Sequence, residues 1–538
     1  MKFSNLMFRH TLLSLMLVAA VCHRSEAVDV VVRQVADLNP NGDSNPYGFT
    51  EFNDLLFFGA NGEQGEELYL SNGDVTELVE DINPFGDSAP SDFVEFNNQL
   101  YFTAAGPLGR ELYRYDGFTT NLVADVAPQE SSSNPRELTV FKDWLYFSAS
   151  AVGSDFELFR TNGTATERIS VDSGIVPTPS SLTVANDDLY FAATGTAGIE
   201  LYRTDGSTVS LAADVNPNGN SFPNWLTPYE DGLVFWANVD AGLEPYELDG
   251  DGVRLLADIN PGPAKSSPNR FTEFDGKLYF GAHDGSSPEV FRYDGEQVSL
   301  VQDLNPNVVD ENEGFPFAFD VIDDQLFVSA FGPGGLDLYS LRSEGSIETL
   351  ELAADTNPSS HSFPVELTEF ADDVFFIGFD EEGFLAGEPE LFQLNDGETR
   401  AANSHGVGEN KQPTDLIAYS GELFFPGTGD DGNELYKASL AGDANEDGRV
   451  DFADFLTFTT NFSESNAAWE EGDFNLDGEV GFPDFLFLSL NFGARAGADA
   501  TDVSNVPEPH FPAWLISIAF IPFLNRRISS ESKQMFPK

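Results

Sequence analysis

Two short segments near the C-terminal end of the chain carry oxygen-bearing side chains at a regular spacing. In the first, "GDANEDGRVDFADFLTFTTNF", they occupy positions one, three, five, nine and twelve of a loop: Asp443, Asn445, Asp447, Asp451 and Asp454. Gly448 stands at position six, where such a loop must turn sharply, and Arg449 at position seven offers only its backbone carbonyl. Hard oxygen ligands at this spacing suit Ca2+, so the segment predicts a calcium-binding loop.

The second segment, "GDFNLDGEVGFPDFLFLSLNF", begins 30 residues after the first and repeats its pattern. Its predicted ligands are Asp473, Asn475, Asp477, the backbone carbonyl of Glu479, and Asp484. Gly481 at position nine has no side chain, so a water must take that place. Each loop leads into an apolar segment with helical spacing. Acidic turns that arose by chance are the competing interpretation, but two matched copies favour two calcium sites.

Another acidic residue recurs through the middle of the chain, where "ELYRYDG" at Glu111 returns as "ELYLSNG", "ELFRTNG", "ELYRTDG" and "EVFRYDG". Its positions, 43 to 53 residues apart, are Glu67, Glu111, Glu157, Glu200, Glu244, Glu289, Asp337, Glu390 and Glu434. Chemistry needs a catalytic acid once or as a close pair, so this repetition indicates a structural role. The glutamates would accept backbone N–H bonds or pair with Arg114, Arg160 and Arg203, and repeated cation binding is the alternative.

Each repeat reads as four short strands, like residues 75–81, 93–96, 100–104 and 111–115. Aromatic and β-branched residues alternate in them, and an Asp-Gly or Asn-Gly pair after the last one is typical of a hairpin. Four strands in about 45 residues match one blade of a propeller. We therefore expect an all-β propeller of eight or nine four-stranded blades over residues 28–440.

The two ends of the repeat region predict how this ring closes. The last unit stops at "ELYKASL" without its closing strand, and the chain begins with an orphan strand of that type at Val28 to Pro40. Joined, the two complete one blade and remove an exposed sheet edge. Because propellers usually have four to eight blades, the divergent unit around Asp337 or the long one before Glu390 is expected to be an insertion.

The repeats contain few conventional catalytic groups. Only His283, His361 and His405 lie in them, and none has a metal-ligand spacing. The sequence has no GxSxG, HExxH or P-loop motif. The catalytic residues, if any, are therefore unknown, and an acidic pair of the glycosidase type stays open among the many carboxylates.

Charge and the two termini indicate where the protein acts. The chain has 90 Asp and Glu against 26 Lys and Arg, so nucleic acid is excluded as a partner by repulsion of its phosphates. Residues 1–27 have the pattern of a signal peptide, with basic residues, an apolar run and "SEA" before the cleavage point. At the other end, "VPEP", an apolar run and an Arg pair occupy residues 506–538, and a membrane anchor is the alternative to a processing signal.

Three resemblances to known families follow from these motifs. The paired loops resemble a type I dockerin over 441–495, which implies calcium-dependent folding and docking to a cohesin-like partner. "ELYRTDGS" resembles the "ELWxTDGT" word of bacterial exported repeat proteins, which implies a propeller. Residues 506–538, after a linker at 496–505, resemble a PEP-CTERM sorting tail, which implies processing by an exosortase-type enzyme and only transient contact with the membrane.

These expectations combine into an exported, cell-surface or extracellular recognition or scaffold protein that docks through its dockerin. The dockerin resemblance implies a role in polysaccharide utilisation. In such dockerins the pair after position nine is often small and hydroxylated, whereas here it is Phe452-Ala453 and Phe482-Pro483, so packing of this surface against the propeller is an alternative. A dockerin-bearing carbohydrate-active enzyme, either hydrolase or lyase, is the alternative function, and calcium-dependent assembly of copies is a third.

Overall fold

The computed structural model describes residues 28–496, apart from 128–130, 152–154, 172–173, 176–177, 307–315, 317, 346, 381–387, 403–411 and 430. The chain divides into two compact units. One is Val32–Ala438, and the other combines residues 28–31 with residues 439–496. The expected signal peptide, the linker from residue 497 and the sorting tail lie outside the described residues.

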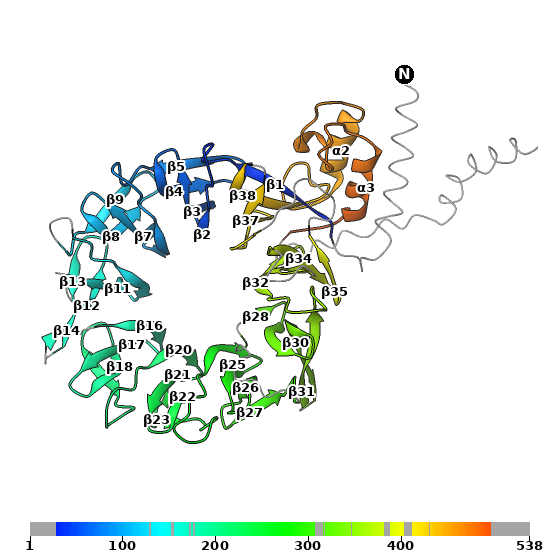
Figure 1. Cartoon of the computed structure of the whole chain (residues 1–538). Helices are drawn as coiled ribbons and strands as arrows, with labels where there is room; N and C mark the ends of the chain where they lie inside the picture. Colours follow the sequence, from blue (N-terminus) through cyan, green and yellow to red (C-terminus); the bar gives the residue numbers. More distant parts are fainter. Residues whose placement is uncertain are drawn as a thin grey trace, which may run out of the picture. The chain divides into compact units, whose positions relative to one another are not determined.

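The larger unit is built from four-stranded antiparallel sheets that follow one another round a ring (Figure 1). Blade 1 is β2 (Tyr47–Phe52), β3 (Leu55–Gly62), β4 (Gly65–Ser71) and β5 (Thr76–Glu80). Blade 2 is β6 (Ser91–Phe96), β7 (Gln99–Gly106), β8 (Gly109–Tyr115) and β9 (Thr120–Ala124). Blade 3 is β10 (Arg136–Phe141), β11 (Trp144–Ser150), β12 (Phe156–Thr161) and β13 (Thr166–Arg168). A small hairpin, β14 (Ser170–Val171) and β15 (Gly174–Ile175), follows.

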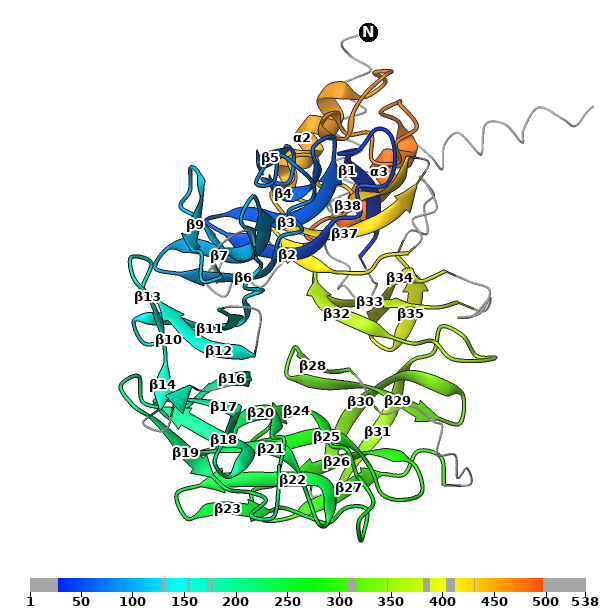
Figure 2. The same cartoon turned by 60° about the vertical axis from the view of Figure 1, so that its left-hand side comes forward.

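The next blades repeat this order. Blade 4 is β16 (Ser180–Ala185), β17 (Asp188–Gly195), β18 (Gly198–Thr204) and β19 (Val209–Ala213). Blade 5 is β20 (Asn224–Tyr229), β21 (Gly232–Val239), β22 (Gly242–Asp249) and β23 (Gly252–Leu255), which Figure 2 shows side by side. Blade 6 is β24 (Asn269–Phe274), β25 (Lys277–His283), β26 (Pro288–Tyr293) and β27 (Val298–Gln302).

Three further sheets complete the ring. Blade 7 is β28 (Phe319–Ile322), β29 (Gln325–Gly332), β30 (Gly335–Glu344) and β31 (Ile347–Ala354). Blade 8 is β32 (Val365–Phe370), β33 (Asp373–Gly378), β34 (Glu390–Asn395) and β35 (Glu398–Ala401). Blade 9 joins β36 (Ile417–Tyr419), β37 (Glu422–Gly429) and β38 (Gly432–Leu440) to β1 (Val30–Ala36). The fold is therefore a nine-bladed propeller.

Two details of the ring bear on the predictions. The order β1-β38-β37-β36 confirms that the N-terminal strand completes the last blade. The expectation of an insertion is wrong, because Asp337 lies in β30 of a complete blade 7, and Glu390 begins β34 of a complete blade 8. Sequence divergence in these two units leaves their four strands intact.

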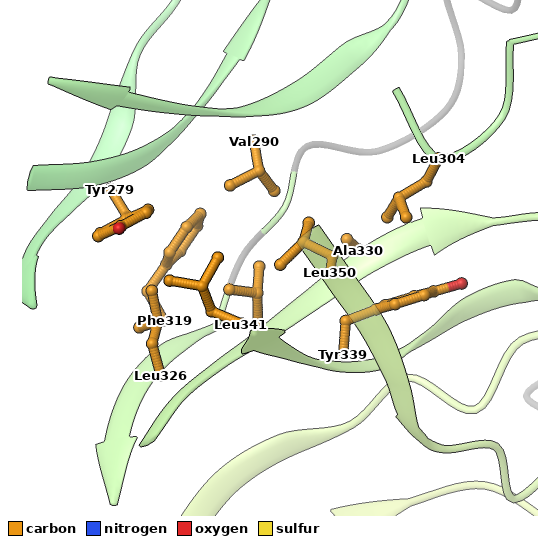
Figure 3. Packing of buried hydrophobic residues seen from close by; sticks show 10 residues of the cluster. Tyr279, Val290, Leu304, Phe319, Leu326, Ala330, Tyr339, Leu341 and Leu350 are labelled. Carbon is orange, nitrogen blue, oxygen red and sulfur yellow. The ribbon is translucent and has the colours of Figure 1, made fainter. Parts of the chain in front are cut away.

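Apolar contacts between neighbouring blades form the core of the ring. Figure 3 shows Tyr279 and Val290 of blade 6 packed with Phe319, Leu326 and Leu341 of blade 7. A cluster containing Leu56 and Phe58 of blade 1 and Phe424 and Leu435 of blade 9 closes the ring in the same way. Burial of such side chains is the main favourable term in folding, so each blade depends on the next.

The smaller unit contains α2 (Phe452–Asn461), the 3-10 turn η1 (Trp469–Glu471) and α3 (Phe482–Asn491). Asp451 caps α2 by accepting the N–H of Ala453. Phe458 and Phe485, from the two helices, lie in its buried core with ring centroids 6.0 Å apart. Within the part of the chain that the structure describes, no helix is both long and apolar enough to cross a membrane.

Candidate functional site

The first predicted calcium loop is held by its own carboxylates. Asp443 accepts the backbone N–H of Gly448 on Oδ2 (2.9 Å), and Gly448 has a φ of 72°, as the sharp turn at position six requires. Asp454 accepts the N–H of Ala444 on Oδ1 (2.9 Å) and that of Asp451 on Oδ2 (2.7 Å). The loop therefore folds around positions one and twelve, and both of these side chains are buried.

The second loop repeats this arrangement bond for bond. Asp473 accepts the N–H of Gly478 (2.8 Å), and Asp484 accepts those of Phe474 (2.9 Å) and Gly481 (2.8 Å). At positions three and five, Asn475 donates to Asp477 (2.9 Å), as Asn445 does to Asp447 in the first loop (2.9 Å). Two segments 30 residues apart thus build one local structure twice.

The remaining predicted ligands lie at the edges of the loops. Asp451 caps helix α2, and Gly481 is its counterpart before α3. Arg449 and Glu479 form isolated β-bridges with Arg495 and Ser465, respectively. In the described ranges, however, no three His, Cys, Asp or Glu side chains form a group arranged to hold a metal. In this structure the carboxylates at positions one and twelve are turned to backbone N–H groups.

Burial and like charge act together at these loops. Burial, followed by the nearby charges of Asp454 and Asp447, raises the pKa of Asp443 to about 7. Burial also raises the pKa of Asp454, Asp473 and Asp484. None of these four carboxylates forms an ion pair with Lys or Arg among the described residues, although a buried charge needs compensation. The donors are all oxygens, so the set fits a hard cation such as Ca2+.

The repeated glutamates form a second set of buried carboxylates. Glu111 in β8 is fully buried and accepts the backbone N–H of Ser133 (2.9 Å) as well as its hydroxyl. Ser133 lies 22 residues later, in the segment that leads to the next blade. Glu200 and Glu244 bind Ser221 and Ser266 in the same way. We call this contact the Glu–Ser clamp.

The clamp confirms the structural interpretation of the repeated glutamate at these blades. Glu434 closes the ring with the same contact, since it accepts the N–H of Ser44 (3.2 Å) and its hydroxyl. Glu157 pairs with Arg168 (3.3 Å), but pairing of the repeated glutamates with the three expected arginines is wrong. Arg114 and Arg160 donate to the carbonyls of Gly163 and Gly206, and Arg203 pairs with Asp188. These arginines bind neighbouring hairpins or strands.

Burial raises the pKa of every clamp carboxylate that has just been described: Glu111, Glu200, Glu244 and Glu434. The rise is largest at Glu289 and Asp337, and of these two Asp337 keeps the hydroxyl of the equivalent serine, Ser362 (2.7 Å). Burial raises the pKa of Glu289 to about 7, and that of Asp337 to about 6. Glu289 accepts the hydroxyl of Ser287 (2.8 Å), which lies two residues earlier in the chain. After burial, the nearby charges of Asp303 and Asp355 add to the rise in pKa at Glu289 and Asp337, respectively.

The two histidines that the structure describes, His283 and His361, form no catalytic arrangement. His361 accepts the N–H of Leu336 (3.0 Å), and His283 accepts that of Gly285 (2.9 Å). His405 lies outside the described residues. His283 therefore acts as a local acceptor in a turn, whereas His361 binds strand β30 to the segment before β32.

The sequence did not single out one row of residues, which occupies equivalent places on the innermost strands. In each blade, one residue of the first strand pairs with Phe57, Tyr101 or their equivalent in the second strand. The member of the row lies two residues before that paired residue in the chain. The row is Gly48, Asp92, Glu137, Ser181, Trp225, Arg270, Ala318, Glu366 and Asp415. We call it the inner row. In the sequence, this row is marked only by a residue that varies from repeat to repeat while the residues around it stay similar.

No protein-family model matches the chain, and no curated protein is similar to it in sequence. Among solved structures, the computationally designed Ika8 protein matches 66% of this chain and 96% of its own, with 14% identity and a TM-score of 0.37. The β-propeller domain of the Trilobed protease from Pyrococcus furiosus matches 66% of this chain and 97% of its own, with 12% identity and a TM-score of 0.32.

A puromycin-hydrolyzing peptidase from Mycobacterium tuberculosis matches 75% of this chain and 62% of its own, with 10% identity and a TM-score of 0.37. These similarities are too distant to carry an argument about function. The assignment to a propeller rests on the nine sheets of this chain.

Proposed function

We propose that this chain is an exported recognition or scaffold protein in which the propeller binds a ligand and the smaller unit binds two Ca2+ ions and docks to a partner. The observation that carries the proposal is the duplicated loop. Both copies hold buried carboxylates at positions one and twelve with the same bonds and no basic partner among the described residues. A divalent cation would compensate that charge, and polysaccharide utilisation is the setting that we propose.

Calcium binding is tested by titrating the full chain with Ca2+ in a calorimeter after treatment with a chelator. We expect two ions per chain. Asp454→Ala and Asp484→Ala should each remove one, since each takes the position-twelve carboxylate from one loop. Asp231→Asn, at an exposed turn in blade 5, is the control and should leave two. A chain that binds no Ca2+ would exclude this part of the proposal.

Docking is supported by apolar side chains that stay exposed on the two helices. Phe452 and Leu456 on α2 are 52% and 50% exposed, and Phe482 and Leu486 are their counterparts on α3. A cohesin-like module is the proposed partner. Leu456→Asp combined with Leu486→Asp should abolish binding of a cohesin panel while both Ca2+ ions stay bound. Unchanged binding by the double variant would place the docking surface elsewhere.

Export is proposed from the two terminal segments and is tested by cell fractionation. The full chain, expressed in a host with an exosortase-type enzyme, should reach the cell surface or the medium without residues 1–27 and without its sorting tail. Retention of the intact chain in the cytoplasm would contradict the proposal.

A carbohydrate-active enzyme is the second candidate, favoured by acidic groups at the inner side of the ring. Loss of hydration raises the pKa of Asp320 and Glu366, as expected for a general acid. Release of new chain ends from soluble polysaccharides by the full chain, lost in Glu366→Gln, would favour this candidate. Binding without such release would favour recognition.

A further inference from the structure

The inner row is the place where the repeats differ from one another. The flanking words of each blade stay recognisable, yet this position holds glycine, alanine, serine, acids, a base and a tryptophan in turn. The innermost strands, such as β2, β16, β20 and β28, line the inner side of the ring (Figure 1). Variation at a position that the fold repeats nine times means that the fold does not dictate the side chain there.

The backbone conformation at the inner row also indicates that its side chains are used. In blades 1 to 6 and in blade 8 a β-bulge falls at this position. The residue there has a φ between 51° and 68°, the left-handed region that favours glycine. Only blade 1 uses glycine, Gly48. Six blades therefore keep a side chain where glycine would be less strained, which indicates that the side chain is used.

Four members of the row make a side-chain hydrogen bond with a structural use, and one of them is Ser181, whose hydroxyl donates to the side-chain oxygen of Asn224 (3.2 Å). Glu137 accepts the N–H of Leu182 in the next blade (3.1 Å), and Asp415 accepts that of Gly48 (3.1 Å). Asp92 accepts the hydroxyl of Thr103 (3.1 Å). The side chains of Trp225, Arg270 and Glu366 have no such bond among the described residues, and they come from blades 5, 6 and 8.

Asp320 adds a fourth group between them. It occupies a place that most other blades give to threonine, as shown by its pairing with Phe327 and by that of Thr272 with Tyr279. Thr272 donates to the carbonyl of Phe319 (3.4 Å), so the start of β28 lies against β24 of blade 6. A carboxylate thus replaces a threonine next to Arg270.

Arg270 is the group that lies near each of the other three. The guanidinium carbon of Arg270 is 5.8 Å from the ring centroid of Trp225, and Trp225 is 43% exposed. Arg270 lowers the pKa of both Asp320 and Glu366, while burial raises it more, so all three lie within electrostatic reach. Even so, no ion pair joins them among the described residues. The charged groups stay available to a ligand.

We propose that Trp225, Arg270, Asp320 and Glu366 form a binding site for an uncharged sugar residue of a glycan. The inference rests on the proposed recognition function of the propeller and names its ligand class. An indole face packs against the apolar face of a sugar ring, and a guanidinium and two carboxylates donate to and accept from its hydroxyls. Two carboxylates with Asp415 nearby, against one arginine, disfavour a sugar that carries carboxylate or sulfate groups.

The test uses calorimetry of the full chain with uncharged gluco-, xylo- and manno-hexasaccharides, and with hexagalacturonate as the acidic probe. The wild-type chain should bind at least one uncharged probe and not the acidic one. Trp225→Gly should weaken that binding at least tenfold without lowering the melting temperature, because glycine fits this backbone as Gly48 does in blade 1. Glu366→Gln should weaken it as well.

Phe118→Ala is the matched control, since Phe118 is an aromatic residue that is 90% exposed on an outer hairpin. It should leave binding unchanged. Unchanged binding in Trp225→Gly would overturn the site and leave glycan recognition intact. Binding of the acidic probe alone would overturn the ligand class. If no glycan binds, both this inference and the recognition role of the propeller fail, while the Ca2+ titration still decides the function of the smaller unit.

Discussion

Glu111 shows at the residue scale how one buried carboxylate can serve a repeat. Its two oxygens accept a backbone N–H and a hydroxyl from Ser133, in the segment that runs to the next blade. Hydrogen bonds to the charged form offset the loss of hydration that burial causes. The period of the glutamate was predictable from the sequence. Its partner was not, because the serine lies 22 residues away and is brought close only by the fold.

Glu111→Ala should therefore destabilise the propeller. Removing the carboxylate takes the acceptor from the buried hydroxyl of Ser133 and leaves its N–H only the carbonyl of Arg110 (3.1 Å), which costs about 2 kcal/mol. The measurement is equilibrium unfolding in urea. Glu95→Ala, at an exposed position of the same blade, is the control and should change stability little. Equal effects of the two variants would show that the clamp contributes nothing.

Glu289 makes stability depend on pH in a defined direction. Its pKa rises from 4.5 to about 7 on folding, so the folded chain binds more protons than the unfolded chain between these values. The stabilisation is present below pH 4.5 and is lost as the pH rises through 7. Glu289→Gln removes this titration, so its melting temperature relative to wild type should rise over that window.

The control for this pH dependence is the exposed Glu296→Gln, measured in the same buffers. Its melting temperature relative to wild type should stay level with pH. If the difference in melting temperature between wild type and Glu289→Gln also stays level with pH, Glu289 has the same pKa in the folded and unfolded states.

Strands and helices show what local patterns can and cannot predict. The alternation in residues 93–96, 100–104 and 111–115 predicted strands that the structure places at Ser91–Phe96, Gln99–Gly106 and Gly109–Tyr115. The two loops were likewise readable, since their ligand positions are close in sequence. The bulges that create the inner row were not, because a shift in register is visible only once the neighbouring strand is in place.

Asn491, the last residue of α3, fastens the start of β1. Its Oδ1 accepts the N–H of Asp29 (2.9 Å), and its Nδ2 donates to the carbonyls of Asp29 (2.6 Å) and Ala441 (2.7 Å). Asn491→Ala should remove these bonds at a cost of about 2 kcal/mol, although the carbonyl of Asp29 still accepts the N–H of Ala441 (2.9 Å). Hydrogen exchange of the amides of residues 29–31 should become faster.

Asn461 is the matched control, because it ends α2 at the equivalent place and donates only to the carbonyl of Glu471, at an exposed site. Asn461→Ala should leave exchange at residues 29–31 unchanged. If Asn491→Ala also leaves it unchanged, the start of β1 is held by its strand pairing alone.

At the scale of the whole molecule, nine blades form because each of the nine sequence repeats buries the apolar face of its sheet against the next blade. The sequence count of nine units was correct, and the expected insertion came from the usual range of blade numbers rather than from a residue. Tyr419 of blade 9 donates to the carbonyl of Asp54 of blade 1 (2.6 Å), so the ring has no free end at this junction. Closure then depends on β1, the one strand that comes from the other end of the chain.

Deletion of residues 28–36 should therefore leave blade 9 with three strands and expose the edge of β38. A free edge pairs with other chains, so the shortened protein should melt at a lower temperature and self-associate in light scattering. A synthetic peptide of residues 28–40 should restore the monomer and the melting temperature by adding the missing strand, whereas a scrambled peptide should not. A shortened protein that stays monomeric and equally stable would show that packing between blades 9 and 1 closes the ring without strand exchange.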